Sequence, residues 1–393
     1  MELQYYPAMN AKTALGFFPI TKFHHFHNDV NINYQLNRFL ISGLEYVFAE
    51  IGSKIKNFDD WKRLFLDRAS SFEDEGEIDF AMGLYRAAEF FITPGDPDKI
   101  IAYEKILSLF YQGKEGGNLK RIMVPYGTGH LYGFRLTPLL PDKGTIIIHG
   151  GFDSYIEEFY SLGIAFCESG YHVVMFDGPG QGNTLMLEKM PMTHEWEKPV
   201  AAVLDYFGLD NVTLIGISLG SYLAIRAASL EARVQRVIAY DVMLDFFECV
   251  TSRRGKITEF LLKSFVKLKL SFVLNFFAGI MMKRDLYSQW GTNQGMHVLG
   301  CKTPYAFFLK LKDYNGYGVS GNVKGDVLIM AGANDHFVPL KQFFKQLKLL
   351  TNAKSVTGRV FTSKEQAQSH CQVGNLGIAF VNMLGWIDEH SFQ

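Results

Sequence analysis

The chain has 393 residues, and its 48% content of hydrophobic residues excludes an intrinsically disordered or fibrous protein. Its 39 Lys and Arg residues are balanced by 40 Asp and Glu residues, which excludes a dedicated nucleic-acid binder that needs excess positive charge. Since a single α/β domain takes about 250 residues, we expect at least one substantial addition to such a domain.

Residues 1–117 are predicted to form an N-terminal helical domain. Apolar residues recur every three or four positions from about residue 31 to residue 112. The segment 93–99 interrupts this pattern, and Asp96 or a neighbour is expected to cap a further helix. Because the first residues carry no basic and apolar leader pattern, we expect a cytoplasmic protein.

From residue 119 the hydrophobic periodicity changes from helical to alternating, which predicts a β-hairpin from 120–126 and 130–136. Short apolar runs follow, each too short for a helix and too apolar for a sheet with one exposed face. These runs are 145–150, 172–177, 212–218, 236–241 and 327–332. Helical patterns lie between them, at 155–169, 194–207 and 219–230. Strands that alternate with helices predict a doubly wound, mostly parallel α/β sheet.

This alternation stops at residue 242, where a helical, Phe-rich segment of about eighty residues begins. We expect 242–322 to be a lid inserted between two parts of an α/β core, 118–241 and 323–393. Within the insertion, residues 252–284 contain eight Lys and Arg residues against one acid, Glu259. A lid with one face on a pocket and one in water is preferred to contact with an anionic membrane.

The segment Gly216-Ile217-Ser218-Leu219-Gly220 joins a predicted strand to a predicted helix. This context is typical of a nucleophile elbow, in which a sharp turn holds the serine in a strained backbone conformation. Glycines two residues before and after the serine allow the strand and helix to approach closely. Ser218 is therefore the candidate nucleophile, in preference to an ordinary serine in a βα turn.

A nucleophilic serine needs a base, and the base needs an orienting acid. Asp335 lies just beyond the strand that ends at residue 332, whereas its rival Asp326 precedes that strand. His370 follows the last predicted strand, 355–361, and is expected to begin the terminal helix. His336 is the competing base, but as the neighbour of the acid its ring should point away.

Two backbone N–H groups should stabilise the negative charge on the carbonyl oxygen. We expect one from Leu219, directly after the nucleophile, and the other from Phe152, with Gly151 as the alternative. His149 is expected to shape this loop and to take no part in proton transfer.

These residues make positions 119–393 resemble the α/β-hydrolase superfamily. The string FDGPGQG at 176–182, the loop GGFDSYIEE and the N-terminal helices resemble one subgroup. It includes 2,6-dihydroxypseudooxynicotine hydrolase, fungal polyketide-shortening hydrolases and bacterial acylaminoacyl-peptidase-like proteins. For carbon–carbon hydrolases of this subgroup the resemblance implies an extra pocket carboxylate. Glu248 lies near that place, with Asp245 as the alternative and a solvated lid carboxylate as the plainer interpretation.

The expected function is a serine hydrolase that cleaves an ester or amide of a small apolar or aromatic substrate through an acyl-enzyme. Carbon–carbon hydrolysis of a β-diketone-like or polyketide-like compound is the enzymatic alternative, and a noncatalytic binding module is the alternative of another class. We expect no cofactor and no metal, since four scattered cysteines and the cluster FHHFH at 23–27 lack the spacing of a metal site. A homodimer is left open.

Overall fold

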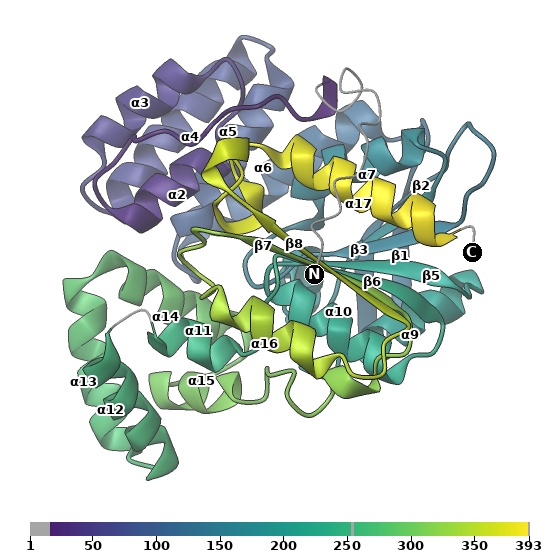
Figure 1. Cartoon of the computed structure of the whole chain (residues 1–393). Helices are drawn as coiled ribbons and strands as arrows, with labels where there is room; N and C mark the ends of the chain where they lie inside the picture. The colour runs from purple at the N-terminus through teal and green to yellow at the C-terminus, as the bar shows by residue number, and fades with distance from the viewer. Residues whose placement is uncertain (1–15, 253–254, 392–393) are drawn as a thin grey trace.

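An eight-stranded sheet forms the centre of the computed structural model, which describes residues 16–252 and 255–391 (Figure 1). The strands are β1 (Leu119–Tyr126), β2 (Gly129–Leu136), β3 (Thr145–His149), β4 (His172–Asp177), β5 (Val212–Ile217), β6 (Val234–Tyr240), β7 (Asp326–Gly332) and β8 (Ser355–Phe361). Their order across the sheet is β1-β2-β4-β3-β5-β6-β7-β8. Strand β2 runs antiparallel to β1 and β4, and all other neighbours are parallel. The predicted mostly parallel sheet is therefore confirmed.

Both faces of the central strands are buried, because successive residues alternate between two apolar clusters. In β3, Ile147 belongs to one cluster, whereas Ile146 and Ile148 belong to the other. Leu214 and Ile215 of β5 divide in the same way. This double burial explains why the strands read as uninterrupted apolar runs.

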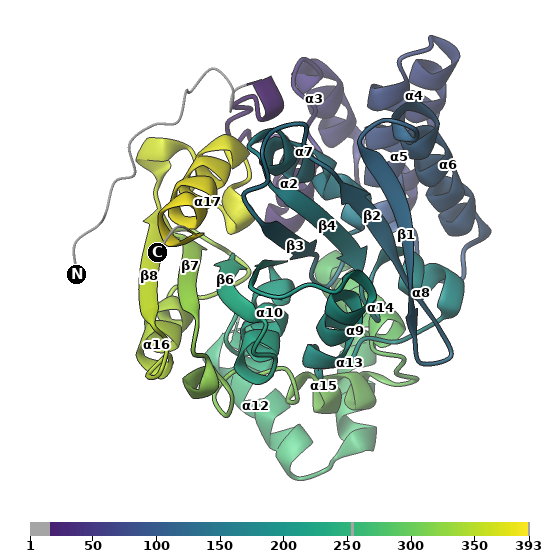
Figure 2. The same cartoon turned by 90° about the vertical axis from the view of Figure 1, so that its right-hand side faces the viewer.

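Helices cover each face of the sheet, as Figures 1 and 2 show. The helices on one face are α7 (Tyr160–Glu168) and α17 (Leu376–Ser391). Those on the opposite face are α9 (Glu197–Phe207), α10 (Leu219–Leu230) and α16 (Lys341–Leu349). A short helix that was not predicted, α8 (Gly182–Glu188), packs beside β2.

Five helices precede the sheet within the described residues and have an apolar core of their own, which includes Trp61 and Phe65. They are α2 (Val30–Arg38), α3 (Glu45–Lys54), α4 (Phe58–Asp74), α5 (Ile78–Phe91) and α6 (Pro97–Lys114). The Asp96 carboxylate accepts a hydrogen bond from the Asp98 N–H, at 3.0 Å, and caps α6. The interruption of the helical pattern at 93–99 therefore contains the start of α6.

A second group of helices lies between β6 and β7. They are α11 (Phe246–Ser252), α12 (Lys256–Lys267), α13 (Ser271–Arg284), α14 (Leu286–Val298) and α15 (Pro304–Leu311). Arg253 and Arg254 of the basic stretch lie outside the described residues. Figure 1 shows this green group and the purple N-terminal helices at the same end of the sheet, while α12 and α13 project away from the body.

The predicted start of the terminal helix at His370 is wrong. His370 lies in a short 3-10 turn, η4 (His370–Gln372), and α17 begins only at Leu376. Cys371 and Gln372 both have positive φ angles, 49° and 51°, so the backbone cannot continue as a right-handed helix there. Among the described residues, no helix has the length and apolar character needed to cross a bilayer.

Candidate active site

Ser218 lies in the sharp turn between β5 and α10, with a φ of 59° and a ψ of −123°. Its N–H donates to the Tyr240 carbonyl at 2.7 Å, which ties the turn to the neighbouring strand. A Cβ at Gly216 would lie 2.0 Å from the Gly220 carbonyl oxygen, so a larger residue cannot fit there. The strained serine and the close strand–helix approach that the motif predicts are both present in the structure.

His370 joins Ser218 to Asp335 through its two ring nitrogens. Its Nε2 lies 2.8 Å from Ser218 Oγ, and its Nδ1 lies 2.5 Å from Asp335 Oδ2. The other oxygen of Asp335 accepts from the N–H groups of Phe337 at 2.6 Å and Val338 at 3.0 Å. The aspartate is thus fixed by its own loop, and it fixes the imidazole with Nε2 toward the serine.

Electrostatics at this pair favour a protonated imidazole. Burial alone would lower the pKa of His370, but the charge of Asp335 and its hydrogen bond raise that pKa well above 6.5. Burial alone would raise the pKa of Asp335, yet His370 holds it below 3.8. The arrangement therefore stabilises the positive charge that His370 acquires when it accepts a proton.

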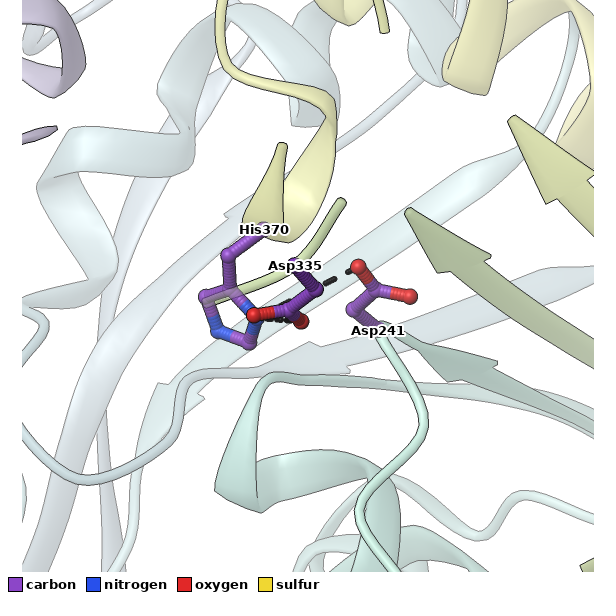
Figure 3. Close-up of side chains that lie close together, drawn as sticks. All are labelled: Asp241, Asp335 and His370. Carbon is purple, nitrogen blue, oxygen red and sulfur yellow. Dashed lines mark hydrogen bonds and ion pairs between the residues drawn. The ribbon is translucent and has the colours of Figure 1, made fainter. Parts of the chain in front are cut away.

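A second carboxylate, Asp241 at the end of β6, faces the same ring nitrogen of His370 (Figure 3). Its Oδ2 lies 4.0 Å from His370 Nδ1 and accepts from the N–H groups of Gly332 at 3.1 Å and Cys371 at 3.2 Å. Burial, followed by the charge of Asp335, raises the pKa of Asp241 to about 7. Asp241 was predicted only as the end of a strand, and this position at the carboxyl end of a parallel strand is the signal that could have identified it.

Asp241, Asp335 and His370 also offer three ligand atoms within 4.8 Å of one another, the distance range of a metal site. The His370 nitrogen and the Asp335 oxygen are already hydrogen-bonded to each other, at 2.5 Å. A cation would have to replace this bond, so the donor set fits a proton-transfer pair better than a metal site.

The loop after β3 lies directly against the serine turn. A Cβ at Gly151 would lie 2.9 Å from the Leu219 nitrogen and 3.2 Å from the Ser218 Cβ, so only glycine allows this approach. The Gly151 N–H donates to Ser154 Oγ at 3.1 Å. Within the described residues, the N–H groups of Leu219 and Phe152 have no hydrogen-bond acceptor. These two amides, rather than that of Gly151, are thus free to bind a negatively charged oxygen.

The side chain of Gln181, in the FDGPGQG string, binds the backbone of this loop. Its side-chain Nε2 donates to the carbonyls of Gly150 at 2.7 Å and Gly151 at 3.0 Å, while its Oε1 accepts from the Gly178 N–H at 3.0 Å. The side chain is almost fully buried. Gln181 was not among the site residues predicted from the sequence.

Two arginines of the N-terminal helices hold the far side of the same loop. Arg38 of α2 pairs with Asp153 at 2.9 Å and with Glu158 at 3.0 Å. Arg86 of α5 also pairs with Glu158, at 2.5 Å, and donates to the Asp153 carbonyl at 2.7 Å. The residue next to Phe152 is therefore fixed by charged groups from another part of the chain.

His149 makes only structural contacts. Its Nδ1 lies 3.0 Å from the Gly150 carbonyl, and its Nε2 accepts from the Trp196 indole N–H at 3.1 Å. Burial lowers its pKa to about 4, so the ring is neutral near pH 7.

Two histidines of the FHHFH cluster are bound to the backbone of their surroundings. His24 and His27 each bond to a backbone carbonyl, those of Thr21 at 2.7 Å and Ile55 at 3.2 Å.

Ser218 and His370 open into a cavity of about 680 Å³. Its wall combines the sheet end, the N-terminal helices and the inserted helices, with Phe39, Phe110, Phe246, Trp290, Phe307 and Phe337 among its apolar side chains. Both helical additions therefore help to enclose the space above the serine. This volume is within the range of pockets that bury a small organic ligand.

The expectation that Glu248 supplies a pocket acid is wrong for this structure, because Glu248 does not line the cavity. Its carboxylate faces α16, where it pairs with Lys341 at 2.8 Å and accepts from Gln342 Nε2 at 3.0 Å. The alternative, Asp245, caps α11 by accepting from the Glu248 N–H at 2.9 Å. Burial opposes ionisation of Glu248, but Lys341 outweighs it and lowers the pKa of that carboxyl.

The rival acid and base lie apart from this arrangement. Asp326 begins β7 at the opposite end from Gly332 and accepts from Ser355 Oγ at 2.7 Å. The His336 ring packs against Tyr34 and Phe337, with ring centres 4.8 Å and 4.0 Å apart.

Comparisons with known proteins agree with this architecture. The family model described as the alpha/beta hydrolase fold matches residues 145–253. The chain is 27% identical over 397 residues to 20-hydroxy-prefusarin hydrolase FUS2 of Gibberella moniliformis, an alignment that covers 89% of this chain and 94% of that protein. It is also 27% identical over 349 residues to hydrolase acrC of Aspergillus aculeatus, with 79% of each protein covered.

Two solved structures share the fold over most of the chain. The crystal structure of 2,6-dihydroxy-pseudo-oxynicotine hydrolase has a TM-score of 0.62 at 18% identity, covering 91% of this chain and 95% of that chain. The structure of wild-type AbyA5 has a TM-score of 0.67 at 14% identity, covering 92% and 94%. The chain therefore has the α/β-hydrolase fold, and it is similar in sequence to the fungal hydrolases and in structure to the pseudo-oxynicotine hydrolase.

Proposed function

We propose that the protein is a serine hydrolase in which Ser218, His370 and Asp335 form the catalytic triad. The observation that supports this role is the continuous hydrogen-bonded path from Ser218 Oγ through His370 to Asp335, which opens into an apolar cavity. A noncatalytic binding module would need neither a strained serine nor a base fixed in line with it.

In the proposed mechanism, Ser218 Oγ attacks the substrate carbonyl while His370 Nε2 accepts the hydroxyl proton. The carbonyl oxygen becomes negatively charged and is bound by the N–H groups of Leu219 and Phe152. His370 then gives the proton to the leaving group, and an acyl-enzyme remains. Water, deprotonated by the same nitrogen, attacks this ester and releases Ser218.

Ester or amide hydrolysis is favoured over carbon–carbon cleavage because the cavity offers no acid without a partner among the described residues. Asp153 and Glu158 pair with Arg38. Glu157 accepts from Tyr111 Oη at 2.9 Å, and Asp79 pairs with Lys114. The second oxygen of Glu157, Oε2, has no hydrogen-bond partner in the described part of the chain but is buried. Cleavage of a β-diketone assisted by an additional carboxylate would therefore require this oxygen to become exposed or one of these contacts to break.

The cavity supports a small apolar or aromatic substrate. Its volume of about 680 Å³ exceeds what a short acyl group fills, and its wall is rich in aromatic side chains. The name of the Gibberella relative, a hydrolase of 20-hydroxy-prefusarin, supports a specific small molecule over a polymer.

The test compares turnover of p-nitrophenyl esters of graded chain length with turnover of a β-diketone panel. We expect ester hydrolysis that improves from acetyl to medium-chain acyl groups and falls at least about 10⁴-fold in Ser218→Ala. Ser229→Ala, on the exterior of α10, is the matched control and should behave as the wild type. If the protein turned over only the β-diketones, the assignment as an ester hydrolase would be wrong. Equal rates of ester hydrolysis in the wild type and in Ser218→Ala would refute Ser218 as the nucleophile.

A further inference from the structure

The hairpin of α12 and α13 exposes large apolar side chains to solvent on its outer surface. Ile257, Phe260 and Phe272 are 79%, 68% and 83% exposed. The other members of this outer patch are Leu261, Leu268, Leu270, Phe276 and Phe277. Their exposed area is on the order of 900 Å², above the roughly 300–600 Å² of the largest patch on an ordinary monomer.

This exposure differs from the expectation for the insertion. The sequence predicted a Phe-rich lid with one face on a pocket and the other face in water. Phe246 and Phe307 do line the cavity, whereas Phe272 and Phe276 face solvent. The outer face of the hairpin thus needs an explanation other than substrate binding.

Helix α12 divides into three lengthwise faces. Leu262 and Val266, four residues apart, are buried against the rest of the protein. Ile257, Phe260, Leu261 and Leu268 lie on the outward face, because Phe260 and Leu261 follow Ile257 by three and four residues, Leu268 follows Leu261 by seven, and residues at these spacings share one side of a helix. Lysines 256, 263 and 267 form a row between these two faces and are exposed. An apolar stripe beside a lysine row is the arrangement of a helix that lies in a membrane interface.

The charge of the hairpin is also one-sided. Residues 255–284 contain six basic side chains and one acid, Glu259, although the whole chain carries a net charge of −1. The basic residues are Lys256, Lys263, Lys267, Lys269, Lys283 and Arg284, and all are exposed. Within this segment Glu259 pairs with Lys263, and the six basic residues less this one acid leave the segment with a net charge of +5.

We propose that the outer patch of the α12–α13 hairpin docks the protein onto an anionic lipid bilayer, with the apolar side chains in the interface and the lysines at the headgroups. The opposite charges of hairpin and headgroups favour this occupant over a second copy of the chain. Face-to-face pairing of two copies would bring the two lysine rows together. The absence of a membrane-spanning helix among the described residues fits a surface contact and not an insertion across the bilayer.

The position of the hairpin gives this contact a functional meaning. Helix α13 packs against α14 and α15, which contribute Trp290 and Phe307 to the cavity wall. Docking would therefore hold the helices that enclose the site close to a lipid phase, in which an apolar substrate accumulates.

The test is co-sedimentation of the full chain with phosphatidylcholine vesicles that contain or lack 30% phosphatidylglycerol. We expect binding to the anionic vesicles at 50 mM NaCl and at least a tenfold loss of affinity at 500 mM. The triple variant Phe260→Ser, Phe272→Ser, Phe276→Ser should weaken binding at least tenfold. The double variant Leu139→Ser, Leu140→Ser removes exposed apolar side chains elsewhere and should bind as the wild type.

The charge contribution is tested by Lys256→Gln, Lys267→Gln, Lys283→Gln. This triple variant should weaken binding to anionic vesicles, whereas Lys120→Gln, Lys324→Gln, Lys364→Gln should not. All these positions are exposed, so the lysine variants should have the same circular dichroism spectrum and the same turnover of short-chain esters as the wild type. Failure of the wild type to bind anionic vesicles, or equal binding by the Phe variant, would overturn the proposal. So would a dimer in sedimentation velocity that the Phe variant dissociates, because the patch would then be a contact between copies.

Discussion

Replacement of Asp241 by Asn tests whether the second carboxylate sets the protonation of His370. The substitution is nearly isosteric and removes only the charge. Asp241 Oδ2 accepts from Gly332, Cys371 and, at 3.3 Å, from Gln372, and an Asn oxygen can keep these three bonds. Asp241 Oδ1 has no partner among the described residues, so the new NH₂ group displaces no donor.

The expected effect follows from the 4.0 Å distance between Asp241 Oδ2 and His370 Nδ1. Two unit charges at this distance interact by about 4 kcal/mol at an effective dielectric constant of about 20, or about 3 pKa units at most. The pKa of Asp241 is itself about 7, so this carboxylate carries its full negative charge only above that pH. We therefore expect the pKa of His370 to fall by about one unit in Asp241→Asn.

The sign is fixed by the charge removed. A nearby negative charge stabilises the imidazolium, so its loss lowers the pKa of His370 and leaves the base neutral at lower pH. The acid limb of kcat/KM for an ester substrate should move down by about one unit, with the plateau changed less than tenfold. Asp210→Asn, an exposed acid after α9, is the control. An unchanged or upward-moved acid limb in a folded Asp241→Asn variant would refute the coupling.

Three further substitutions test the supports of the site. Arg38→Gln should lower kcat about 10- to 100-fold with little change in KM for a small ester, since it removes one of the two arginines that hold the loop carrying Phe152; an unchanged kcat would show that Arg38 does not position this loop. Gln181→Leu should also lower kcat, and because it leaves the buried Gly151 carbonyl without a donor and removes one of the two donors to the Gly150 carbonyl, it should reduce the free energy of unfolding by about 1–3 kcal/mol in urea titrations. Gly216→Ala should destabilise the fold by about 3 kcal/mol or more, whereas Gly113→Ala, with open space in an exposed turn of α6, should stabilise it by about 0.5–1 kcal/mol. Equal stabilities of the two alanine variants would contradict the close strand–helix approach.

The fold and the relative positions of three site residues could be predicted from sequence because their signals are local or follow chain order. Ser218 lies in a five-residue motif whose glycines are required by contacts of 2.0–2.4 Å that a Cβ would make. Asp335 and His370 follow the last two strands, and parallel strands bring their carboxyl ends to one edge.

Other contacts could not be predicted because they join distant parts of the chain. Arg38 and Asp153 are 115 residues apart, and Asp241 and Cys371 are 130 residues apart. No periodicity or spacing specifies such pairs. The prediction of Glu248 as a pocket acid was wrong because its carboxylate binds lysines of α16, which come near it only in the folded chain. The exposure of Phe272 depends equally on how the hairpin of α12 and α13 leaves the body of the protein.

The most direct test of the proposed mechanism is covalent labelling with a fluorophosphonate, followed by mass spectrometry of the intact protein and of its peptides. We predict one adduct per chain, located on Ser218, absent in Ser218→Ala and formed far more slowly in His370→Ala. Labelling of Ser218→Ala to the same extent as the wild type, or an adduct on another residue, would contradict the assignment of Ser218 as the nucleophile.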